Sequence, residues 1–600
     1  MSAKPYKNAS STAALQEMAA PARKPTAAME DLGQAGSAAS LARLENAIKE
    51  LKAMAAAPLL QKAVGAMNRE NFVAGGKWAI KALEQDEFSG LGWYLLGMAR
   101  ERAGDYASSV QAYEAALKLI PEHADIANDL GRLANRMGMH EQAEKLFRHY
   151  AAHMPDSLEA VNNLASAIKD QGRYDEATAV LKEALSRRPD SALLWNTLAT
   201  VMNEQANLEN ALIFFNEAAR LDPKYANPRY NLSQVKIVLG DAEGALADCE
   251  AAIKIKGGTA DDRAMMKLAR SNFLLACGRI GEGWDEYEIR LSSEFGDVTH
   301  FAIDRPRWKP GSKIEGKTLL VVGEQGLGDE VLFSNLLPDV VEALGPNGKL
   351  QLAVEARLVP LYQRTFPDAE VTRHRTVAWA TRPLRTLPDF DQSRTDLWAP
   401  IGSLLREYRR SIESYPPRVG FLTPDPDRVA HWKKVLDEQA PPGPKVGILW
   451  KSLIGKNARH RFFSPFERWK GVLQTPGVSF INLQYGDCEA ELAEAKAELG
   501  VTIWQPPGID LKMDLDDVSA LCAAMDLVIG FSNATVNLAG AAGAPTWIIT
   551  PAAAWTRLNA ENGYPWYPQA RTFLNHDIQD WDPVMNEVTD ALGAFAKERA

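Results

Sequence analysis

Small and bulky residues recur every 34 residues through the first half of the chain, and four prolines at Pro121, Pro155, Pro189 and Pro223 mark the period. Two places in each interval hold small residues: Gly97, Gly131, Ala165, Ala199 and Ser233 at one, and Ser109, Ala143, Ala177, Ala211 and Ala245 at the other. A third place is mostly bulky: Tyr113, Phe147, Leu181, Phe215 and Cys249. Antiparallel helices pack closely when small residues line their crossing and a bulky one fills the gap. Each interval therefore predicts a helix pair.

These repeats resemble tetratricopeptide (TPR) repeats. One helix pair cannot bury its own apolar face, so the pairs must stack. We predict an all-α TPR superhelix over residues 56–293, with a degenerate first unit at 56–89 and an atypical capping pair at 260–293. Residues 1–38 are rich in Ala, Ser and Pro and are predicted to be disordered. Residues 39–55 predict a helix that either caps the first repeat or binds a partner.

The pattern changes near Phe301, where short apolar runs begin to alternate with helical patterns. The strand-like runs are KTLLVVGE, KLQLAVE, KVGILW, VSFINLQ, DLVIG and PTWIIT. Alternation of this kind predicts parallel sheets with helices on their faces. A proline-rich stretch divides the region, so we expect two α/β lobes, at residues 294–425 and 426–600, that face each other across a cleft.

Composition excludes some classes of function. The formal net charge of −10 argues against a general nucleic-acid binder, although a local basic pocket remains open. Cys249, Cys277, Cys488 and Cys522 form no CxxC pair, so neither a zinc module nor a disulfide framework is indicated. No run approaches the roughly 18 apolar residues of a membrane span, and the N-terminus lacks a signal-peptide core. These features predict a cytoplasmic protein without a membrane span.

Three motifs carry a second resemblance: GEQGLGDEVLF at 323–333, VGILW at 446–450 and LVIGFSNATVNLAGAAGAPTW at 527–547, with ENGYPWYPQAR at 561–571 also typical. The chain resembles bacterial TPR-containing glycosyltransferases whose C-terminal halves have the GT-B fold, two Rossmann-like lobes. It is similar to the heptosyltransferase group and, in layout, to O-linked N-acetylglucosamine transferase. Within that family it looks most like the FlmG-type flagellin glycosyltransferases of alphaproteobacteria.

The glycine-rich loop after residue 322 is the acceptor side that this resemblance implies. Its aspartate, Asp329, corresponds to the family's general base toward the acceptor hydroxyl, and Gly326 and Gly328 would let an acceptor approach the backbone closely. The alternative is that Asp329 opens a helix and caps its first N–H groups. Both roles can hold together.

The donor side is expected on the second lobe, because a nucleotide-sugar carries phosphate that favours a helix N-terminus and cationic side chains. The candidates are Ser532, Asn533, Ala534, Thr535 and Asn537 at the turn SNAT, and Lys451, Lys456, Arg459 and Arg461 after VGILW. The cations are alternatively solvated loop charges. Where the heptosyltransferase-like pattern has Asp-Thr-x-x-x-His, this chain has Ser532, Asn533 and Asn537. The change indicates a different donor or a loss of activity.

Three further patterns have both a functional and a structural interpretation. An asparagine ladder, formed by Asn128, Asn162, Asn163, Asn196 and Asn231, either grips an acceptor backbone, as a comparable ladder does in the O-GlcNAc transferases it resembles, or bonds helix to helix. His149 and His153 have a metal-binding spacing but no third ligand, so we interpret them as surface residues. Asp514 and Asp516 mimic a DxD metal motif, but we interpret Asp514 as a helix cap and expect no metal site.

The sequence therefore predicts a protein O-glycosyltransferase that needs no metal or other cofactor. The TPR groove captures a protein acceptor, and the α/β half transfers a sugar from a nucleotide donor to Ser or Thr. The FlmG-type resemblance implies flagellin as the acceptor and a CMP-activated nonulosonic acid, such as pseudaminic acid, as the donor. Two alternatives remain: an interaction scaffold with a degenerate α/β half, and a glycosyltransferase that acts on a glycan or lipid.

Overall fold

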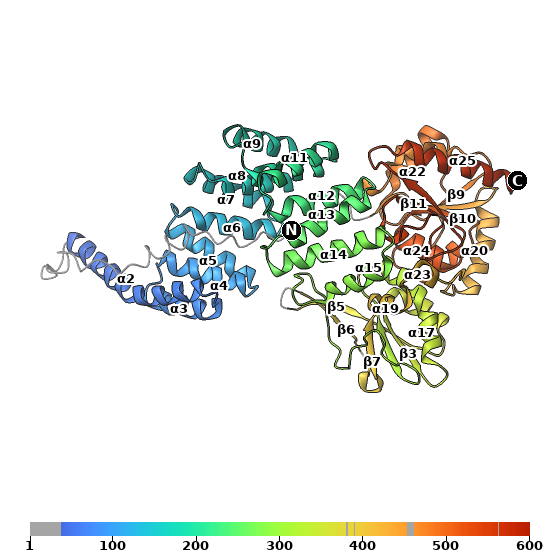
Figure 1. Ribbon diagram of the computed structural model, residues 1–600, viewed down its shortest axis with the longest axis horizontal. Coiled ribbons are helices and arrows are strands. Elements are labelled where there is room, and N and C mark those ends of the chain that lie inside the picture. The colour runs from blue at the N-terminus through green and yellow to red at the C-terminus, as the bar shows by residue number, and fades with distance from the viewer. Residues whose placement is uncertain (1–37, 380–381, 389, 453–460, 562, 600) are drawn as a thin grey trace. The chain divides into compact units, whose positions relative to one another are not determined.

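A computed structural model describes residues 38–379, 382–388, 390–452, 461–561 and 563–599 (Figure 1). The chain divides into two compact units. The first runs to Gln205 and includes Glu209–Pro223, and the second holds Ala206–Leu208 and everything from Lys224 onward. The predicted disordered segment at 1–38 lies, except for its last residue, outside the described residues.

The first unit is an array of antiparallel helices. They are α2 (Ala38–Asn68), α3 (Phe72–Gln85), α4 (Gly90–Arg102), α5 (Tyr106–Leu119), α6 (Ala124–Arg136), α7 (His140–His153), α8 (Leu158–Asp170), α9 (Tyr174–Arg187), α10 (Ala192–Glu204) and α11 (Leu208–Leu221). Each helix from α4 on begins near the place that the repeat predicts, so the TPR prediction is confirmed. A glycine with positive φ at Gly104, Gly138 and Gly172 turns the chain between the helices of a pair.

The repeat packs as its residue types require. A Cβ added to Gly97 would lie 2.6 Å from Tyr113, and one added to Gly131 would lie 2.7 Å from Phe147. The small residues that recur at the same place in the second helix of each pair, including Ala143 and Ala177, are fully buried. The small and bulky places of each pair are therefore in direct contact, because only a small side chain leaves room for the ring.

Helix α2 differs from its prediction in extent. The predicted helix at 39–55 and the first helix of the degenerate repeat form one continuous helix, with Pro58 inside it. Its later half buries Leu60, Val64 and Met67 in the repeat core. Its earlier half leaves Leu41, at 60% of its surface, exposed to solvent together with Leu44, Ile48 and Leu51. These four side chains do not cover the repeat.

The second unit begins with four more helices, α12 (Ala226–Val238), α13 (Ala242–Lys254), α14 (Ala260–Ala276) and α15 (Ile280–Tyr287), and the short turn η2 (Glu288–Leu291). Two parallel sheets follow. The first has the order β4-β3-β2-β7, with strands β2 (Thr318–Val322), β3 (Lys349–Val354), β4 (Glu370–Arg373) and β7 (Leu397–Pro400). The second has the order β12-β11-β10-β8-β9, with strands β8 (Lys445–Ile448), β9 (Ser479–Asn482), β10 (Leu527–Phe531), β11 (Thr546–Pro551) and β12 (Ala570–Asn575).

Helices cover these sheets, as the alternating pattern predicts. Around the first sheet lie α16 (Leu327–Phe333), α17 (Leu337–Leu344), α18 (Val359–Thr365) and α19 (Ile401–Tyr408). The second sheet carries α20 (Pro426–Gln439), α21 (Lys470–Leu473), α22 (Glu489–Leu499), α23 (Leu515–Ala523), α24 (Ala534–Ala541) and α25 (Asp582–Glu598). A small third sheet, β1 (His300–Phe301), β6 (Arg382–Thr386) and β5 (Arg375–Trp379), was not expected from the sequence.

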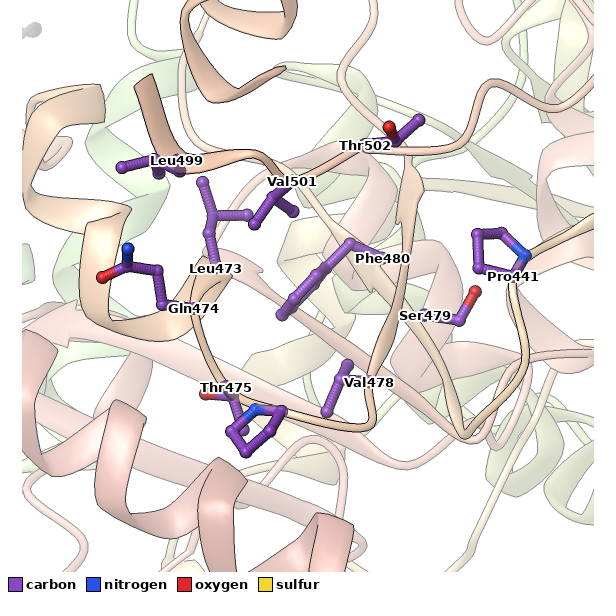
Figure 2. Close-up of a pocket in the computed structure, with 11 residues that line it drawn as sticks. Pro441, Leu473, Gln474, Thr475, Val478, Ser479, Phe480, Leu499, Val501 and Thr502 are labelled. Atoms are coloured by element: carbon purple, nitrogen blue, oxygen red, sulfur yellow. The ribbon is translucent and has the colours of Figure 1, made fainter. Parts of the chain in front are cut away.

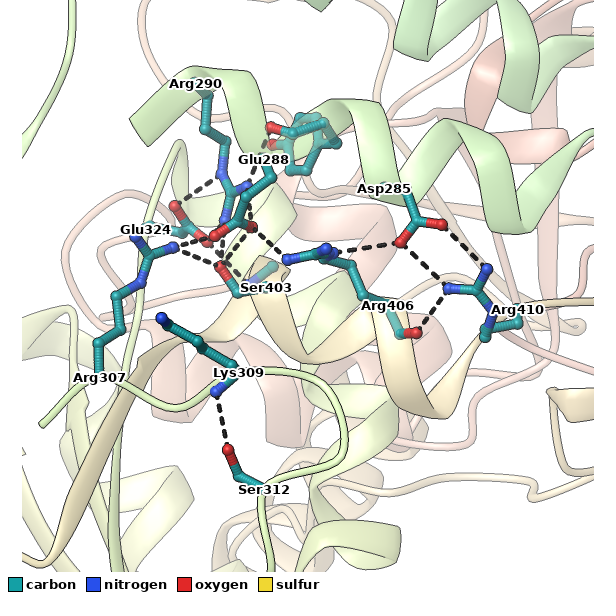
Figure 3. A network of polar contacts seen from close by, with 12 residues as sticks. Asp285, Glu288, Arg290, Arg307, Lys309, Ser312, Glu324, Ser403, Arg406 and Arg410 are labelled. Atoms are coloured by element: carbon teal, nitrogen blue, oxygen red, sulfur yellow. Dashed lines mark hydrogen bonds and ion pairs between the residues drawn. The ribbon is translucent and has the colours of Figure 1, made fainter. Parts of the chain in front are cut away.

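A buried ion pair fixes the start of the first sheet's glycine-rich loop to the last helices before it (Figure 3). Arg290 of η2 donates from Nε to the Glu324 carboxylate at 3.0 Å, and both residues are only 3% exposed. The Gly402 N–H, at the start of α19, donates to the same carboxylate at 2.8 Å. The network continues to the surface through Ser403 and Glu288, and at its rim Arg410 pairs with Asp285 at 3.0 Å.

The close contact between Gly131 and Phe147 predicts a specific stability effect. We expect Gly131→Ala to destabilise the α6–α7 pair by about 1–3 kcal/mol, because the added methyl group overlaps the ring. The matched control is Gly593→Ala in α25, where an added Cβ meets nothing within 4 Å. Hydrogen exchange of the full chain, followed by mass spectrometry in α6 and α7, measures the difference. Unchanged protection there would contradict the packing.

The Arg290–Glu324 pair predicts a second effect. We expect Arg290→Gln to lower the free energy of unfolding by about 3–5 kcal/mol, because it leaves the Glu324 carboxylate buried without its cation. Arg410→Gln removes a half-exposed pair of the same network and should cost at most about 1 kcal/mol. Urea unfolding followed by tryptophan fluorescence compares them. Equal losses for the two variants would count against a special role for the buried pair.

Candidate functional site

The loop between β2 and α16 is built around buried acidic side chains. A Cβ on Gly323 would lie 2.3 Å from the Glu330 carboxylate, so only glycine fits there. Glu330 also accepts the Glu355 N–H at 2.7 Å and contacts His374 Nε2 at 3.1 Å. Gln325 takes a left-handed conformation with φ of 60°, which is uncommon outside glycine. The loop is thus held in one shape from beneath.

Asp329 lies in the first turn of α16 and is partly exposed. Gly326 is the N-cap, so Asp329 is the third residue of the helix and not its cap. Two buried phenols face its charge. Burial raises the pKa of Tyr564, and the nearby Asp329 charge raises it further. Burial also raises the pKa of Tyr287, with a smaller contribution from Asp329. Both phenols therefore remain protonated hydrogen-bond donors at neutral pH.

The turn SNAT of the second sheet meets this loop directly. Asn533 caps α24 by accepting the Val536 N–H at 3.1 Å. One turn further, Asn537 donates from Nδ2 to the Gly328 carbonyl at 3.0 Å. A Cβ on Gly328 would lie 3.4 Å from the Ala534 nitrogen. The N-termini of α16 and α24 therefore converge, and their aligned N–H groups make this point favourable for an anion.

Several buried polar atoms at this point have no hydrogen-bond partner among the described residues. They are Asn533 Nδ2, Asn537 Oδ1, the Tyr564 hydroxyl and Arg557 Nε. Tyr564 lies beside the hydroxyls of Ser532 and Thr556 without good hydrogen-bond geometry to either. Buried polar groups are normally paired, so a cluster of unpaired ones indicates a place for a polar ligand.

Tyr564 and Arg557 are functional candidates that the sequence did not identify. The segment that holds them is packed by an aromatic cluster, in which Trp284 lies 6.0 Å from Phe333 and 6.2 Å from Trp566 between ring centroids. Arg557 is 7% exposed and donates to the carbonyls of Ala552 and Ala560. Burial lowers its pKa. The motif ENGYPWYPQAR stood out in the sequence, but nothing in it indicated which side chain turns inward.

The predicted cations are placed less favourably. Lys451 Nζ pairs with Glu491 of α22, which neutralises its charge. Arg461 stacks on Phe462, with the guanidinium 5.6 Å from the ring centroid. Lys456 and Arg459 lie outside the described residues. The structure thus brings Asp329, Gly328 and the SNAT turn together, including the buried Thr535, whereas the described cations after VGILW have other contacts. Gly326 is open, with only Asp329 Oδ2 near a would-be Cβ, at 3.8 Å.

The asparagine ladder forms bonds within the protein. Asn163 donates to Asn128 at 2.9 Å, Asn162 donates to Asn163 at 3.0 Å, and Asn128 donates to Glu159 at 3.1 Å. Asn196 and Asn231 are buried, at 8% and 6% exposure. These contacts favour the helix-to-helix role. A role in gripping an acceptor stays a prediction.

The side chains of the two metal-like patterns make contacts within the protein. His149 contacts the Pro121 carbonyl at 2.9 Å, and His153 contacts the His149 carbonyl at 2.9 Å. Asp514 caps α23 by accepting the Asp517 N–H at 3.1 Å, and Asp516 makes two 2.8 Å bonds with Arg364. The described part of the chain holds no cluster of three metal-ligating side chains. Nor does any helix in that part have the length and apolar character to cross a membrane.

A hollow of about 560 Å³ lies elsewhere, at the start of the edge strand β9 (Figure 2). Leu473, Phe480, Leu499 and Val501 line it with apolar surface. Asp329 and the SNAT turn follow the carboxyl ends of β2 and β10, whereas the hollow adjoins the opposite, amino end of its own sheet. It is therefore separate from the site at α16 and α24.

Comparison with known proteins gives a family. A tetratricopeptide repeat model matches residues 102–168 and 169–231. A TPR protein of Parabacteroides merdae is 17% identical, covering 39% of this chain and 91% of its own, with a TM-score of 0.34. A thermophilic TPR protein of Thermus thermophilus is 21% identical, covering 30% and 98%, with a TM-score of 0.27. Both scores are too low to carry an argument about this chain.

One relative matches both halves of the chain. Protein FlbA of Caulobacter vibrioides is 50% identical over 573 residues, which span 95% of this chain and 96% of FlbA. The match therefore spans the α/β half of this chain as well as its repeats. On this identity and coverage, the chain belongs to the family of FlbA.

Proposed function

We propose that this protein is a GT-B-type glycosyltransferase that modifies a protein acceptor. The observation that carries the proposal is the meeting of α16 and α24, each of which follows the carboxyl end of a strand in a separate parallel sheet. Open parallel sheets bind ligands at the carboxyl ends of their strands. An acceptor hydroxyl at the Asp329 side and a nucleotide-sugar at the SNAT side would then share one reaction centre.

The residues at this point suit a sugar transfer. Asp329 accepts the proton of the acceptor hydroxyl while that oxygen bonds to the anomeric carbon, and the bond from that carbon to the donor phosphate breaks. Charge develops on the leaving phosphate. The α24 N-terminus, Asn533 Nδ2 and the Tyr564 hydroxyl offer hydrogen-bond donors to it, so the reaction needs no metal.

The TPR array supplies the choice of acceptor in this proposal. Stacked repeats present a long surface to a protein partner. The FlmG-type resemblance of the motifs supports flagellin as the acceptor and a CMP-activated nonulosonic acid as the donor, with transfer to Ser or Thr in the cytoplasm. The neutral Ser532, Asn533 and Asn537 fit a donor that differs from that of the heptosyltransferase-like pattern.

An interaction scaffold is the second candidate function. The Gly328 contact favours it, because the first α/β lobe covers the N-terminus of α24, where a phosphate would bind. A scaffold binds the acceptor but not the nucleotide-sugar. Calorimetric titration of the full chain with CMP, and with the CMP-activated sugar, separates the two candidates.

The proposal predicts that flagellin loses its sugar when Asp329 loses its charge. We expect intact-mass spectra of flagellin to lack the nonulosonic-acid increments both in a deletion strain and in cells with Asp329→Asn, since an amide cannot accept the proton. The control is Asp514→Asn, which keeps a capping side chain at α23 and should leave the mass unchanged. Loss only in the deletion strain would remove Asp329 from the mechanism. An unchanged mass in every strain would exclude flagellin as the acceptor.

The proposal also predicts a donor contact from Tyr564. We expect Tyr564→Phe to weaken binding of the nucleotide donor about tenfold, which is the usual size of one lost hydrogen bond to a charged group. Tyr113→Phe is the control, because that buried phenol donates to Glu101 in the first unit, at 2.9 Å. The titration that measures donor affinity applies to both variants. Equal affinity for the Tyr564 variant and the wild type would show that its hydroxyl faces no ligand.

A further inference from the structure

The small third sheet carries an exposed edge. Strand β5 pairs only with β6 among the described strands, and β6 pairs in turn with β1, so β5 is the outer strand. Most of β5 is exposed on both faces, in contrast to the buried strands of the two large sheets. Its outer edge offers backbone N–H and C=O groups to another chain. Strand edges of this kind can add an extended peptide as a further strand.

Strands β5 and β6 pair antiparallel as a hairpin, and one face of this hairpin exposes an aromatic side chain. Trp379, the last residue of β5, is 57% exposed. It lies opposite Arg382 of β6, and its ring centroid is 5.7 Å from that of His300 on β1. Arg375 and Val377 alternate with it on the same face of the strand. Proteins protect open edges with charge, but that protection does not account for an exposed tryptophan.

The exposed charges on the β5–β6 hairpin and just before it are positive. Arg373 at the end of β4 and Arg375 are exposed, and Arg382 is partly exposed. No carboxylate of the described residues lies within ion-pair distance of these three guanidinium groups, whereas many other arginines of the chain are paired. The chain as a whole carries a net charge of −10. Unpaired cations on an acidic protein complement an acidic partner.

The opposite face of the hairpin reaches the candidate site. Arg385 of β6 is 8% exposed and donates to the carbonyl of Gly323, the first residue of the loop that leads to Asp329. It also donates to Thr376 of β5 at 3.3 Å. A segment bound along β5 would thus lie on the element that holds the acceptor-side loop.

We propose that β5 is a docking strand for an extended, acidic segment of the acceptor protein. Backbone hydrogen bonds to β5 align the segment, Trp379 packs against its apolar side chains, and Arg373, Arg375 and Arg382 pair with its carboxylates. A membrane surface with anionic lipids is the rival partner. It cannot use the unpaired backbone edge, which is why the geometry points to a peptide.

Binding of synthetic peptides to the full chain tests this inference without any nucleotide-sugar. The probe is a short fluorescein-labelled peptide in which glutamate alternates with valine and threonine, and its analogue has glutamine in place of glutamate. By fluorescence anisotropy we expect the glutamate peptide to bind at least about tenfold more tightly than the analogue. Hydrogen exchange should show new protection in residues 375–379 when the peptide is bound.

Matched variants localise the binding. Trp379→Ser, and separately Arg375→Glu with Arg382→Glu, should weaken the glutamate peptide at least about tenfold. Lys434→Glu, on a side chain of α20 that is 71% exposed, should not. Thermal unfolding of each variant checks its fold. Two further peptides carry N-methyl groups on alternate residues, one on the odd positions and one on the even positions. One of the two should not bind, because its methyl groups block the backbone hydrogen bonds of an added strand.

Each contrary result overturns the inference. Equal binding of the two peptides, protection confined to the helical repeats, or unaffected variants would exclude β5 as the docking strand. If the chain binds phosphatidylserine vesicles through Trp379 but does not bind the peptide, then Trp379 and its neighbouring arginines form a membrane-binding surface. The inference rests on the proposed function for its acceptor, but the two fail separately. Peptide binding without sugar transfer would contradict the proposed glycosyltransferase activity. Sugar transfer without peptide binding at β5 would contradict only the proposed docking strand.

Discussion

The geometry of the candidate site depends on one buried carboxylate, Glu324. It lies at the second position of the loop after β2, and Arg290 and the Gly402 N–H hold it from two different elements. A buried charge is tolerated only when it is paired and hydrogen-bonded, so the loop cannot move without exposing or orphaning that charge. Because Asp329 follows five residues later, the ion pair sets where its helix begins.

The second sheet reaches the same point through close backbone contact. Gly328 and Ala534 approach because the former has no side chain, and Asn537 bonds across to the Gly328 carbonyl. Aromatic rings from α15, α16 and the segment around Trp566 fill the space behind the contact. Polar groups such as Asn533 Nδ2 and the Tyr564 hydroxyl are buried there by this packing, which leaves them without a hydrogen-bond partner among the described residues. Packing of apolar groups thus creates the polar site.

The sequence identified the parts of the site that have a local signal. A glycine-rich turn after an apolar run predicted the β2–α16 loop, and SNAT before a helical pattern predicted the start of α24. Residues such as Arg557 and Tyr564 have no such signal, because their role comes from neighbours far away in sequence. The asparagine ladder gave a periodic signal with two physical meanings, and the contacts of Asn128, Asn162 and Asn163 favour the helix-to-helix one.

The repeat and the two large sheets could be predicted from the amino-acid order alone. Helix pairs and parallel strands follow from the spacing of small, bulky and apolar residues. These spacings are local, because they extend over one or two helical turns or over a few residues of a strand. The meeting of α16 with α24 and the exposed edge of β5 emerge only when the chain is folded. Both depend on which surfaces remain after distant segments have packed. The run RTVAW has the pattern of an ordinary short strand. Only the folded structure shows which strand it pairs with, and that no described strand pairs with its outer edge.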